Sequence, residues 1–377
     1  MLPKKLKNKL DARKTENALR TLGTQSNLID FSSNDYLGFS KNENIFNAAH
    51  HYLKEHNNTL NGATGSRLLS GNHNLYTTVE KQLCKFHNSE AALIFNSGYT
   101  TNLGLFSSVP QKDDIIFYDA FIHASIRDGI KMSNAKAYKF EHNNLEDLQK
   151  LLSRHSKLVS ESQHEIYIVT ESVFSMDGDS PDLESLSNVS EKYNCNLIID
   201  EAHAIGLFGK NGRGLANSIK TFARIITFGK ALGSHGAAIL CSDDLKQYLI
   251  NFSRPFIYTT ALPPHALATI KCAYEALEST SEIEKLKQNI SFFKSEIKRL
   301  QLENKFINSD SAIHCCVISG NETIKTIAQD LAKENFSVKP ILSPTVKKGE
   351  ERLRFCIHSY NTKAEISQVL KLLTTFV

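Results

Sequence analysis

Short apolar runs alternate with helix-length amphipathic segments between about residues 45 and 275. The runs cover residues 91–95, 115–118, 166–170, 197–200, 225–228 and 237–241. Near-continuous apolar runs are typical of strands that are buried on both faces, and therefore of a mostly parallel sheet covered by helices. The pattern predicts an α/β fold, whose ligands bind where the strands end.

The two ends of the chain follow other patterns. Residues 1–28 favour a basic amphipathic helix, and 30–40 an extended stretch that ends in a turn. A long helix is expected over 276–305, followed by strands near 312–318 and 353–357 and helices over 322–334 and 363–376. We therefore expect three parts: 1–45, a large cofactor-binding domain over 46–275, and a smaller α+β domain over 276–377.

Composition narrows the class of protein. The chain has 377 residues, 41% hydrophobic and 22% charged, with a net charge of +4. This mild, dispersed charge argues against a nucleic-acid partner, and no apolar run approaches membrane-spanning length. The basic N-terminus has no apolar segment behind it, so a secretory signal is not expected. Seven cysteines without a C-x-x-C pair, and histidines without ligand spacing, predict a reduced, cytoplasmic protein without a metal.

A lysine and an aspartate each follow an apolar run. Lys230 lies in Thr-Phe-Gly-Lys-Ala-Leu-Gly, and Asp200 closes the run at 197–200. A lysine amine can form a Schiff base with pyridoxal 5′-phosphate (PLP), and an aspartate can keep the pyridine nitrogen protonated. By itself Lys230 reads as a surface lysine and Asp200 as a helix N-cap. His203 alone reads as a core histidine, but beside Asp200 it could contact the ring hydroxyl.

An anion site is indicated where the run 91–95 meets the next helix. Ser97, Gly98 and Tyr99 open that helix, and backbone N–H groups at a helix N-terminus attract phosphate. By itself this is an ordinary N-cap. Thr227 offers a hydroxyl to the same phosphate. His123 could stack on the ring, although a structural histidine is the plainer interpretation.

A glycine-rich segment and a pair of arginines also carry chemical information. The glycines at 209, 212 and 214 have the spacing G-x-x-G-x-G, which indicates a turn-rich loop and not a dinucleotide site. Arg352 and Arg354 alternate onto one strand face, where Arg354 could bind a substrate carboxylate. The alternative for Arg354 is an exposed edge-strand arginine.

The order and spacing of six motifs resemble the α-oxoamine synthases, PLP enzymes of fold type I. The motifs are FSSNDYLG (31–38), GATGSRLLSGNH (62–73), ESVFSMDG (171–178), DEAH (200–203), TFGK (227–230) and IYTT (257–260). Members condense a small amino acid with an acyl thioester and release carbon dioxide. Residues 65–71 and 227–231 most resemble the subfamily that joins L-alanine to a pimeloyl thioester in biotin biosynthesis. Tyr76, and Ala204 with Ile205, depart from the expected pattern and leave acyl specificity open.

The resemblance implies a role for each matching residue. Lys230 is the Schiff-base lysine and proton shuttle, Asp200 contacts the pyridine nitrogen, His203 the ring oxygen, and His123 stacks on the ring. The phosphate is held by a set that includes two threonines from the neighbouring subunit of a homodimer: Ser97, Gly98, Tyr99, Ser175, Thr227, Thr259 and Thr260. Asn34 and Arg354 bind the amino-acid substrate.

Several alternatives remain open at this point. The amino acid could be glycine or serine, and the acyl donor could be carried on coenzyme A or on an acyl carrier protein. A non-catalytic scaffolding relative should lack Lys230, which is present. A nicotinamide-dependent oxidoreductase is disfavoured because the G-x-G-x-x-G motif is missing.

Overall fold

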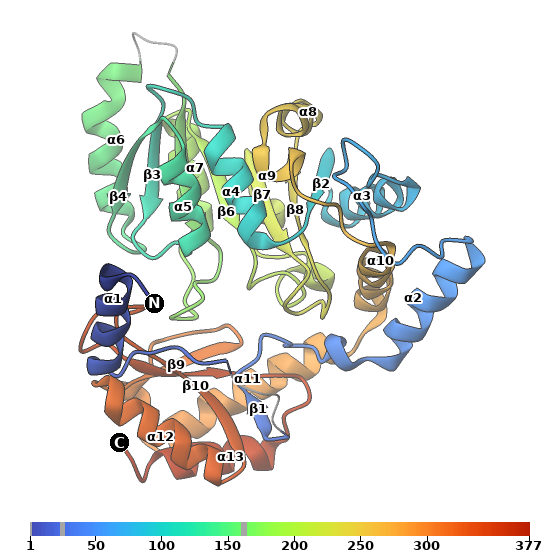
Figure 1. Ribbon diagram of the computed structural model, residues 1–377. Helices are drawn as coiled ribbons and strands as arrows, with labels where there is room; N and C mark the ends of the chain where they lie inside the picture. The colour runs from blue at the N-terminus through green and yellow to red at the C-terminus, as the bar shows by residue number, and fades with distance from the viewer. Residues whose placement is uncertain (1, 23–26, 160–163) are drawn as a thin grey trace. The chain divides into compact units, whose positions relative to one another are not determined.

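The computed structural model describes residues 2–22, 27–159 and 164–377. Two compact units are each assembled from separate stretches of the chain (Figure 1). The larger unit contains residues 37–174 and 180–283, and the smaller contains 1–36, 175–179 and 284–377. The division into 1–45, 46–275 and 276–377 that the sequence suggested stays a prediction.

The larger unit is built on a seven-stranded sheet of order β2-β8-β7-β6-β5-β3-β4. Strands β3 to β7 run parallel, whereas β8 is antiparallel to both β2 and β7. The strand bounds are β2 Ala91–Phe95, β3 Ile115–Asp119, β4 Lys136–Phe140, β5 Ile166–Glu171, β6 Asn196–Asp200, β7 Ala223–Thr227 and β8 Ala237–Cys241. The mostly parallel sheet predicted from the apolar runs is confirmed.

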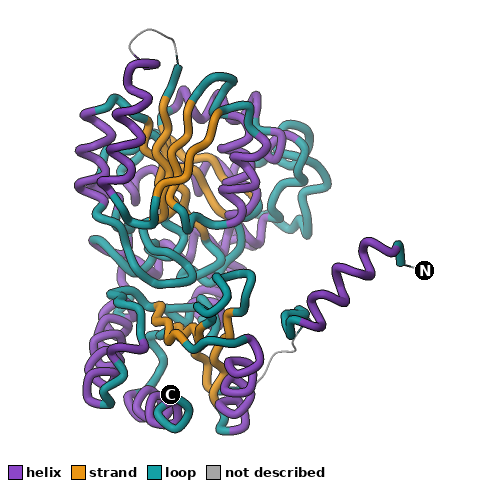
Figure 2. Tube along the Cα trace, turned by 90° about the vertical axis from the view of Figure 1, so that its left-hand side faces the viewer, coloured by secondary structure: helices purple, strands orange, loops and turns teal. Residues whose placement is uncertain are grey.

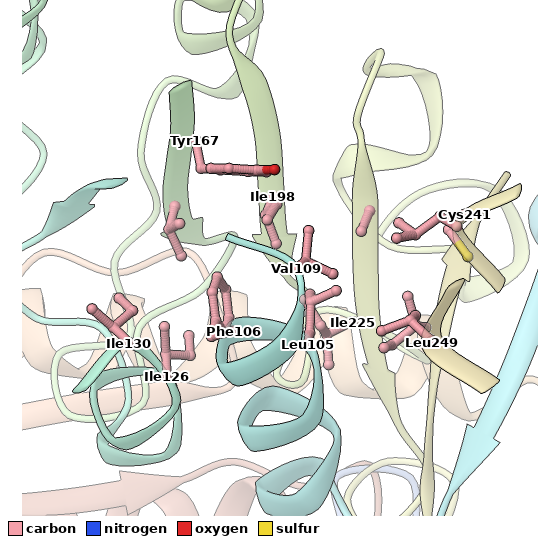
Figure 3. Packing of buried hydrophobic residues seen from close by; sticks show 14 of the residues in the cluster. Leu105, Phe106, Val109, Ile126, Ile130, Tyr167, Ile198, Ile225, Cys241 and Leu249 are labelled. Carbon is pink, nitrogen blue, oxygen red and sulfur yellow. The ribbon is translucent and has the colours of Figure 1, made fainter. Parts of the chain in front are cut away.

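Helices cover both faces of this sheet, as Figure 2 shows. One face packs against α4 (Gly98–Ser108), α5 (Ala124–Met132), α8 (Asp243–Phe252) and α9 (Arg254–Ile257), and the other against α6 (Leu145–Val159) and α7 (Leu183–Lys192). Figure 3 shows the first core, where Leu105 and Phe106 of α4 meet strand residues such as Ile198. Neighbouring residues of a strand serve opposite cores: Ile198 belongs to this one, and Ile199 to the other. This explains why the strands are apolar without alternation.

Strand β4 was not predicted from the sequence. Its residues, Lys-Ala-Tyr-Lys-Phe, are mostly exposed or half-buried because the strand lies at the sheet edge, beside β3 alone. Lysines suit such an edge because they discourage pairing with another chain. The remaining helical elements of this unit are α2 Glu43–Glu55, α3 Asn74–His87, α10 Pro264–Ser279 and the short 3₁₀ turns Phe39–Lys41, Lys210–Gly212 and Ala216–Ser218.

The smaller unit has a four-stranded sheet of order β1-β10-β11-β9, in which β1 is parallel to β10 and the other pairs are antiparallel. The strands are β1 Ile29–Phe31, β9 Ile313–Val317, β10 Phe336–Ile341 and β11 Arg352–Cys356. The helices are α1 Lys4–Thr15, α12 Asn321–Lys333, α13 Lys363–Leu373, most of α11 Glu282–Arg299 and the 3₁₀ turn Glu303–Lys305. The expected α+β character is present, with β1 recruited from near the N-terminus.

The predicted first helix is too long. Helix α1 ends at Thr15, because Asn17 adopts a left-handed conformation with φ of 49°. Met1 and residues 23–26, which fall in the predicted range, lie outside the described residues. The extended stretch expected over 30–40 is also short: β1 stops at Phe31, and the Asp30 carboxylate then accepts hydrogen bonds from the N–H groups of Ser32 and Ser33.

The single long helix predicted over 276–305 is two helices. Helix α10 ends at Ser279, Thr280 is extended, and α11 begins at Glu282, whose N–H group donates to the Thr280 hydroxyl. Strand β10 was missed because it contains Pro340, which usually argues against a strand. In the part of the chain that the structure describes, no helix is both long and apolar enough to cross a membrane.

Candidate PLP site

The carboxyl ends of three adjacent parallel strands carry the central side chains of the larger unit. Asp200 ends β6, Glu171 ends the neighbouring β5 in register with it, and Thr227 ends β7 on the other side. These strands end at the same edge of the sheet, which is where ligands bind in such folds. Asp200 and Thr227, both predicted to contact the cofactor, therefore lie at the same edge of the sheet.

The carboxylate of Asp200 is held from two directions. The residue is only 5% exposed. One oxygen, Oδ1, accepts a hydrogen bond from the N–H of Ala202 (2.9 Å), and Oδ2 accepts one from Nδ2 of Asn102 (2.8 Å). The two N–H donors fix the orientation of the carboxylate, which a partner for a pyridine nitrogen requires. A succession of turns follows Asp200, so it does not cap a helix.

His203 and Lys230 lie in the loops that leave β6 and β7. His203 is buried within the turns after Asp200. Lys230 lies in the β7–β8 connection, where the N–H of Gly233 donates to the Lys230 carbonyl. A Cβ on Gly233 would lie 2.1 Å from the backbone nitrogen of Ser40, so this glycine makes room for the neighbouring chain segment. A Cβ added on Gly229 would make only an ordinary van der Waals contact, 3.5 Å from the backbone oxygen of Ser234.

An anion cradle forms where α4 begins. Ser97 is the N-cap: its hydroxyl accepts from the N–H of Thr100, whose own hydroxyl accepts from the N–H of Ser97. The N–H groups of Gly98 and Tyr99 then occupy the first helical positions, which have no carbonyl partner within the helix. A Cβ on Gly98 would lie 2.8 Å from the Thr227 methyl carbon, so the glycine lets Thr227 reach the helix N-terminus. Ser97 therefore contributes to the cradle by capping helix α4.

His123 stands exposed at the start of α5 and close to these groups. Its backbone N–H donates to the Glu171 carboxyl (2.5 Å), and its Nδ1 accepts from the N–H of Ser125 (3.2 Å). The pKa of His123 is lowered overall. Partial desolvation and the charge of Lys230 lower it, and Asp200 and Asp128 only partly oppose the shift. The exposed imidazole, close to Asp200, leaves room for a planar ring to lie against it.

Glu171 was part of a recognised motif but received no role from the sequence. It is buried, and burial together with the nearby Asp200 carboxylate raises its pKa well above the usual range. Asn102 and Ser125 were also overlooked. Asn102 could have been found from its spacing, because it lies one helical turn after Gly98 and shares its face of α4.

Thr259 and Thr260 lie beside the cradle within one chain. The stretch 257–260, for which an extended conformation is the expectation, begins instead within a helix, because α9 continues to Ile257. Thr260 forms a bridge with Ser66, and its carbonyl accepts from the side chain of Asn96, the residue before the Ser97 cap. The Thr260 residue itself is exposed. A contact with a neighbouring subunit's phosphate stays a prediction.

The smaller unit brings together the remaining predicted residues. Arg354 is 5% exposed, so the alternative of an exposed edge arginine is wrong. Its guanidinium donates to Oδ1 of Asn34 (3.0 Å), the carbonyl of Ser175 (2.7 Å) and Sγ of Cys356 (2.9 Å). Asn34 and Arg354, predicted to bind one substrate, are therefore direct partners, while the phosphate contact of Ser175 stays a prediction.

The residues of the larger unit fit PLP. The Gly98 position admits only a glycine without displacing Thr227, the first N–H groups of α4 suit a phosphate, and Asp200 suits a ring nitrogen. Lys230 supplies the amine that the cofactor aldehyde needs. Among the described residues, no cluster of three or more His, Cys, Asp or Glu side chains could hold a metal ion, and all seven cysteines have free thiols.

Known proteins match the chain almost end to end. The model of the family "Aminotransferase class I and II" matches residues 26–373. An 8-amino-7-oxononanoate synthase of Emericella nidulans is 35% identical over 371 residues, covering 93% of this chain and 90% of that protein. Among solved structures, a serine palmitoyltransferase from S. paucimobilis with PLP bound has a TM-score of 0.88 at 25% identity, covering 99% of this chain and 96% of its own. An 8-amino-7-oxononanoate synthase from Francisella tularensis has a TM-score of 0.76 at 31% identity, covering 93% and 98%.

The chain is a fold type I PLP enzyme that transfers an acyl group. It belongs to the α-oxoamine synthases, a branch of the class I and II aminotransferase family.

Proposed function

We propose that this enzyme condenses L-alanine with a pimeloyl thioester, with loss of carbon dioxide, to form 8-amino-7-oxononanoate for biotin biosynthesis. The observation that carries this choice is the 35% identity, over 93% of the chain, to a relative that bears this name. The motif at residues 66–71 supports the same choice.

The chain's own residues then divide the work. Bound PLP supplies an aldehyde that captures an amine and a protonated ring that withdraws electrons. The first N–H groups of α4 and the Thr227 hydroxyl hold its phosphate, and Asp200 keeps the ring nitrogen protonated. His123 lies against the ring and His203 contacts its oxygen. The Lys230 amine removes the α-proton of alanine and later returns a proton to the product. Asn34 and Arg354 bind the substrate carboxylate.

The test is substrate preference. Purified enzyme is supplied with pimeloyl thioester and alanine, glycine or serine, and the products are identified by mass spectrometry. Coenzyme A and acyl carrier protein donors are compared, because the thiol carrier is open. We expect alanine to be the preferred amino acid, and efficient turnover of glycine or serine with weak alanine turnover would contradict the proposal.

Serine is the second candidate amino acid. The S. paucimobilis serine palmitoyltransferase has a higher TM-score, 0.88, than the F. tularensis synthase, 0.76. A palmitoyl thioester with serine therefore belongs in the same assay. A sphingoid-base product would move the enzyme to that sister activity.

The active unit is proposed to be a homodimer in the cytoplasm. Apolar side chains flank the Ser66–Thr260 bridge: Leu69 is 84% exposed and Tyr258 is 72% exposed. Exposed apolar side chains of this size favour burial against a second protein surface. A two-fold dimer could then bring Thr259 and Thr260 of one chain to the phosphate held by the other.

A mixing experiment tests the shared site. Lys230→Ala chains and Thr259→Ala/Thr260→Ala chains are each expected to be inactive, and co-refolding should restore part of the activity because one hybrid site is whole. Lys230→Ala mixed with Lys230→Ala is the control. A protein that stays monomeric and fully active at assay concentration would exclude the dimer model.

A further inference from the structure

A chain of hydrogen bonds through the buried side chains of Asn102 and Ser125 links Asp200 to His123. Nδ2 of Asn102 donates to Oδ2 of Asp200 (2.8 Å) and to Oγ of Ser125 (3.0 Å). Oγ of Ser125 lies 2.7 Å from Nδ1 of His123. Asn102 and Ser125 are both buried, so bulk water does not compete for the two bonds that Asn102 donates.

The direction of donation along these hydrogen bonds follows from Asp200, the acceptor at one end. An ionised carboxylate only accepts hydrogen bonds, so the atom of Asn102 that faces Asp200 is the amide nitrogen. The second amide hydrogen goes to Oγ of Ser125, and the Ser125 hydroxyl hydrogen is then left for Nδ1 of His123. The backbone N–H of Ser125 points at the same nitrogen from 3.2 Å. Nδ1 therefore receives two donors and carries no proton of its own.

The side-chain oxygen of Asn102 indicates that this residue serves through its two N–H donors. Its Oδ1 is buried and has no hydrogen-bond partner. An unpaired buried acceptor destabilises a protein, and an apolar residue of the same shape would avoid that penalty. The contacts that Asn102 does make are those to Asp200 and Ser125.

We propose that Asn102 and Ser125 are positioning residues that hold His123 as the neutral tautomer with its proton on Nε2, in an orientation tied to Asp200. A neutral ring can lie against a protonated pyridine ring without repulsion between like charges. The charged groups that act on the His123 ring are Asp200 and Asp128, which favour its protonation, and Lys230, which opposes it. The carboxyl of Glu171 accepts a hydrogen bond from the backbone N–H of His123. The inference rests on the proposed placement of PLP beside His123 and Asp200.

The test uses cofactor-free protein, so it does not depend on catalysis. Nitrogen-15 NMR of labelled histidines reads which ring nitrogen of His123 carries the proton, and a pH titration reads its pKa; His123→Gln assigns the signals. In the wild type, Nδ1 should be unprotonated. Ser125→Ala removes the hydroxyl donor that stabilises the neutral ring, so the pKa of His123 should rise by about one pH unit and the tautomers should mix. Asn102→Leu should change the pKa of His123 and its tautomer ratio in the same direction, but by a smaller amount.

Two variants calibrate this result. Ser125→Thr keeps a hydroxyl and should retain the wild-type tautomer. Ser133→Ala removes a hydroxyl at the other end of α5, which bonds only the carbonyl of Ile130, and should change nothing at His123. A protonated Nδ1 in the wild type, or a Ser125→Ala spectrum equal to that of Ser133→Ala, would overturn the proposal.

Addition of PLP separates this inference from the proposed function. The visible absorption of bound PLP should titrate differently with pH in Ser125→Ala and normally in Ser125→Thr. If PLP binds elsewhere, this titration stays unchanged in both variants while the NMR result stands, so the tautomer survives and the placement beside the cofactor fails. A merely structural role for Ser125 would lower PLP occupancy without a change in the tautomer, and that result counts against the proposal.

Discussion

The contact between Gly98 and Thr227 gives a quantitative test of the phosphate cradle. A Cβ added at Gly98 would lie 2.8 Å from the Thr227 methyl carbon and 4.0 Å from its Cβ. Ordinary carbon contacts lie at about 3.5–4.0 Å, so Gly98→Ala forces the start of α4 and the end of β7 apart by about 1 Å. The cradle depends on these two elements remaining adjacent.

Overpacking of this kind costs about 1–3 kcal/mol. If the strain is expressed in the cradle, PLP affinity falls about 5- to 140-fold, at 1.4 kcal/mol for each factor of ten. Thr227→Ser keeps the hydroxyl but removes the methyl group, leaving only the ordinary 4.0 Å contact. The double variant Gly98→Ala/Thr227→Ser should therefore recover most of the lost affinity.

The assay is titration of cofactor-free protein with PLP, followed by visible absorbance. Pyridoxal, which has no phosphate, is the matched control ligand and should bind Gly98→Ala about as well as the wild type. Urea unfolding of each variant checks that the fold is retained. Wild-type PLP affinity in Gly98→Ala, or a double variant no better than the single one, would refute the reasoning.

Three further predictions concern catalysis and stability. Lys230→Ala should abolish turnover and keep a wild-type circular dichroism spectrum, and peptide mapping after borohydride reduction should place the cofactor on Lys230 in the wild type; an adduct on another lysine would end that assignment. Asp200→Asn should lose most activity while still taking up PLP, because an amide cannot stabilise a protonated ring nitrogen; an unchanged kcat would show that Asp200 has another task. Arg224→Met should lower the free energy of unfolding by about 3–5 kcal/mol, because it leaves the buried Glu201 carboxylate without its ion-pair partner. Urea unfolding measures this loss, with the exposed pair Lys287 and Glu284 as the control at about 0–1 kcal/mol; equal losses at both sites would contradict the burial argument.

Stability toward acid should depend on Asp30. Its pKa is lowered to about 2: burial opposes this shift, and hydrogen bonds from Ser33 and Ser32 together with the charge of His358 outweigh it. The pKa of an unfolded aspartate is about 3.9, so Asp30 stabilises the fold above about pH 4, and this contribution is lost as the pH falls toward 2. Asp30→Asn should therefore unfold with a weaker dependence on pH between about 4 and 2, and an unchanged slope would contradict the shift.

Much of the larger unit could be predicted because its signals are local. The runs that became β2 and β8 were placed to the residue, since a strand buried on both faces is apolar throughout. Strand β4 escaped prediction because its environment at the sheet edge, and not its own residues, makes it a strand. Strand β10 escaped because pairing with β1 and β11 outweighs the presence of Pro340.

The sequence by itself determined the chemistry: a lysine, an aspartate and a serine–glycine turn, each after an apolar run, specify the groups that PLP needs. Only the tertiary structure decided how these groups are held. Asn102 and Ser125 read as ordinary polar residues until the fold buries them between Asp200 and His123. Gly98 reads as a helix start until β7 brings Thr227 against it. Hydrogen-bond partners far apart in the sequence depend on strand order and helix packing, which no local pattern encodes.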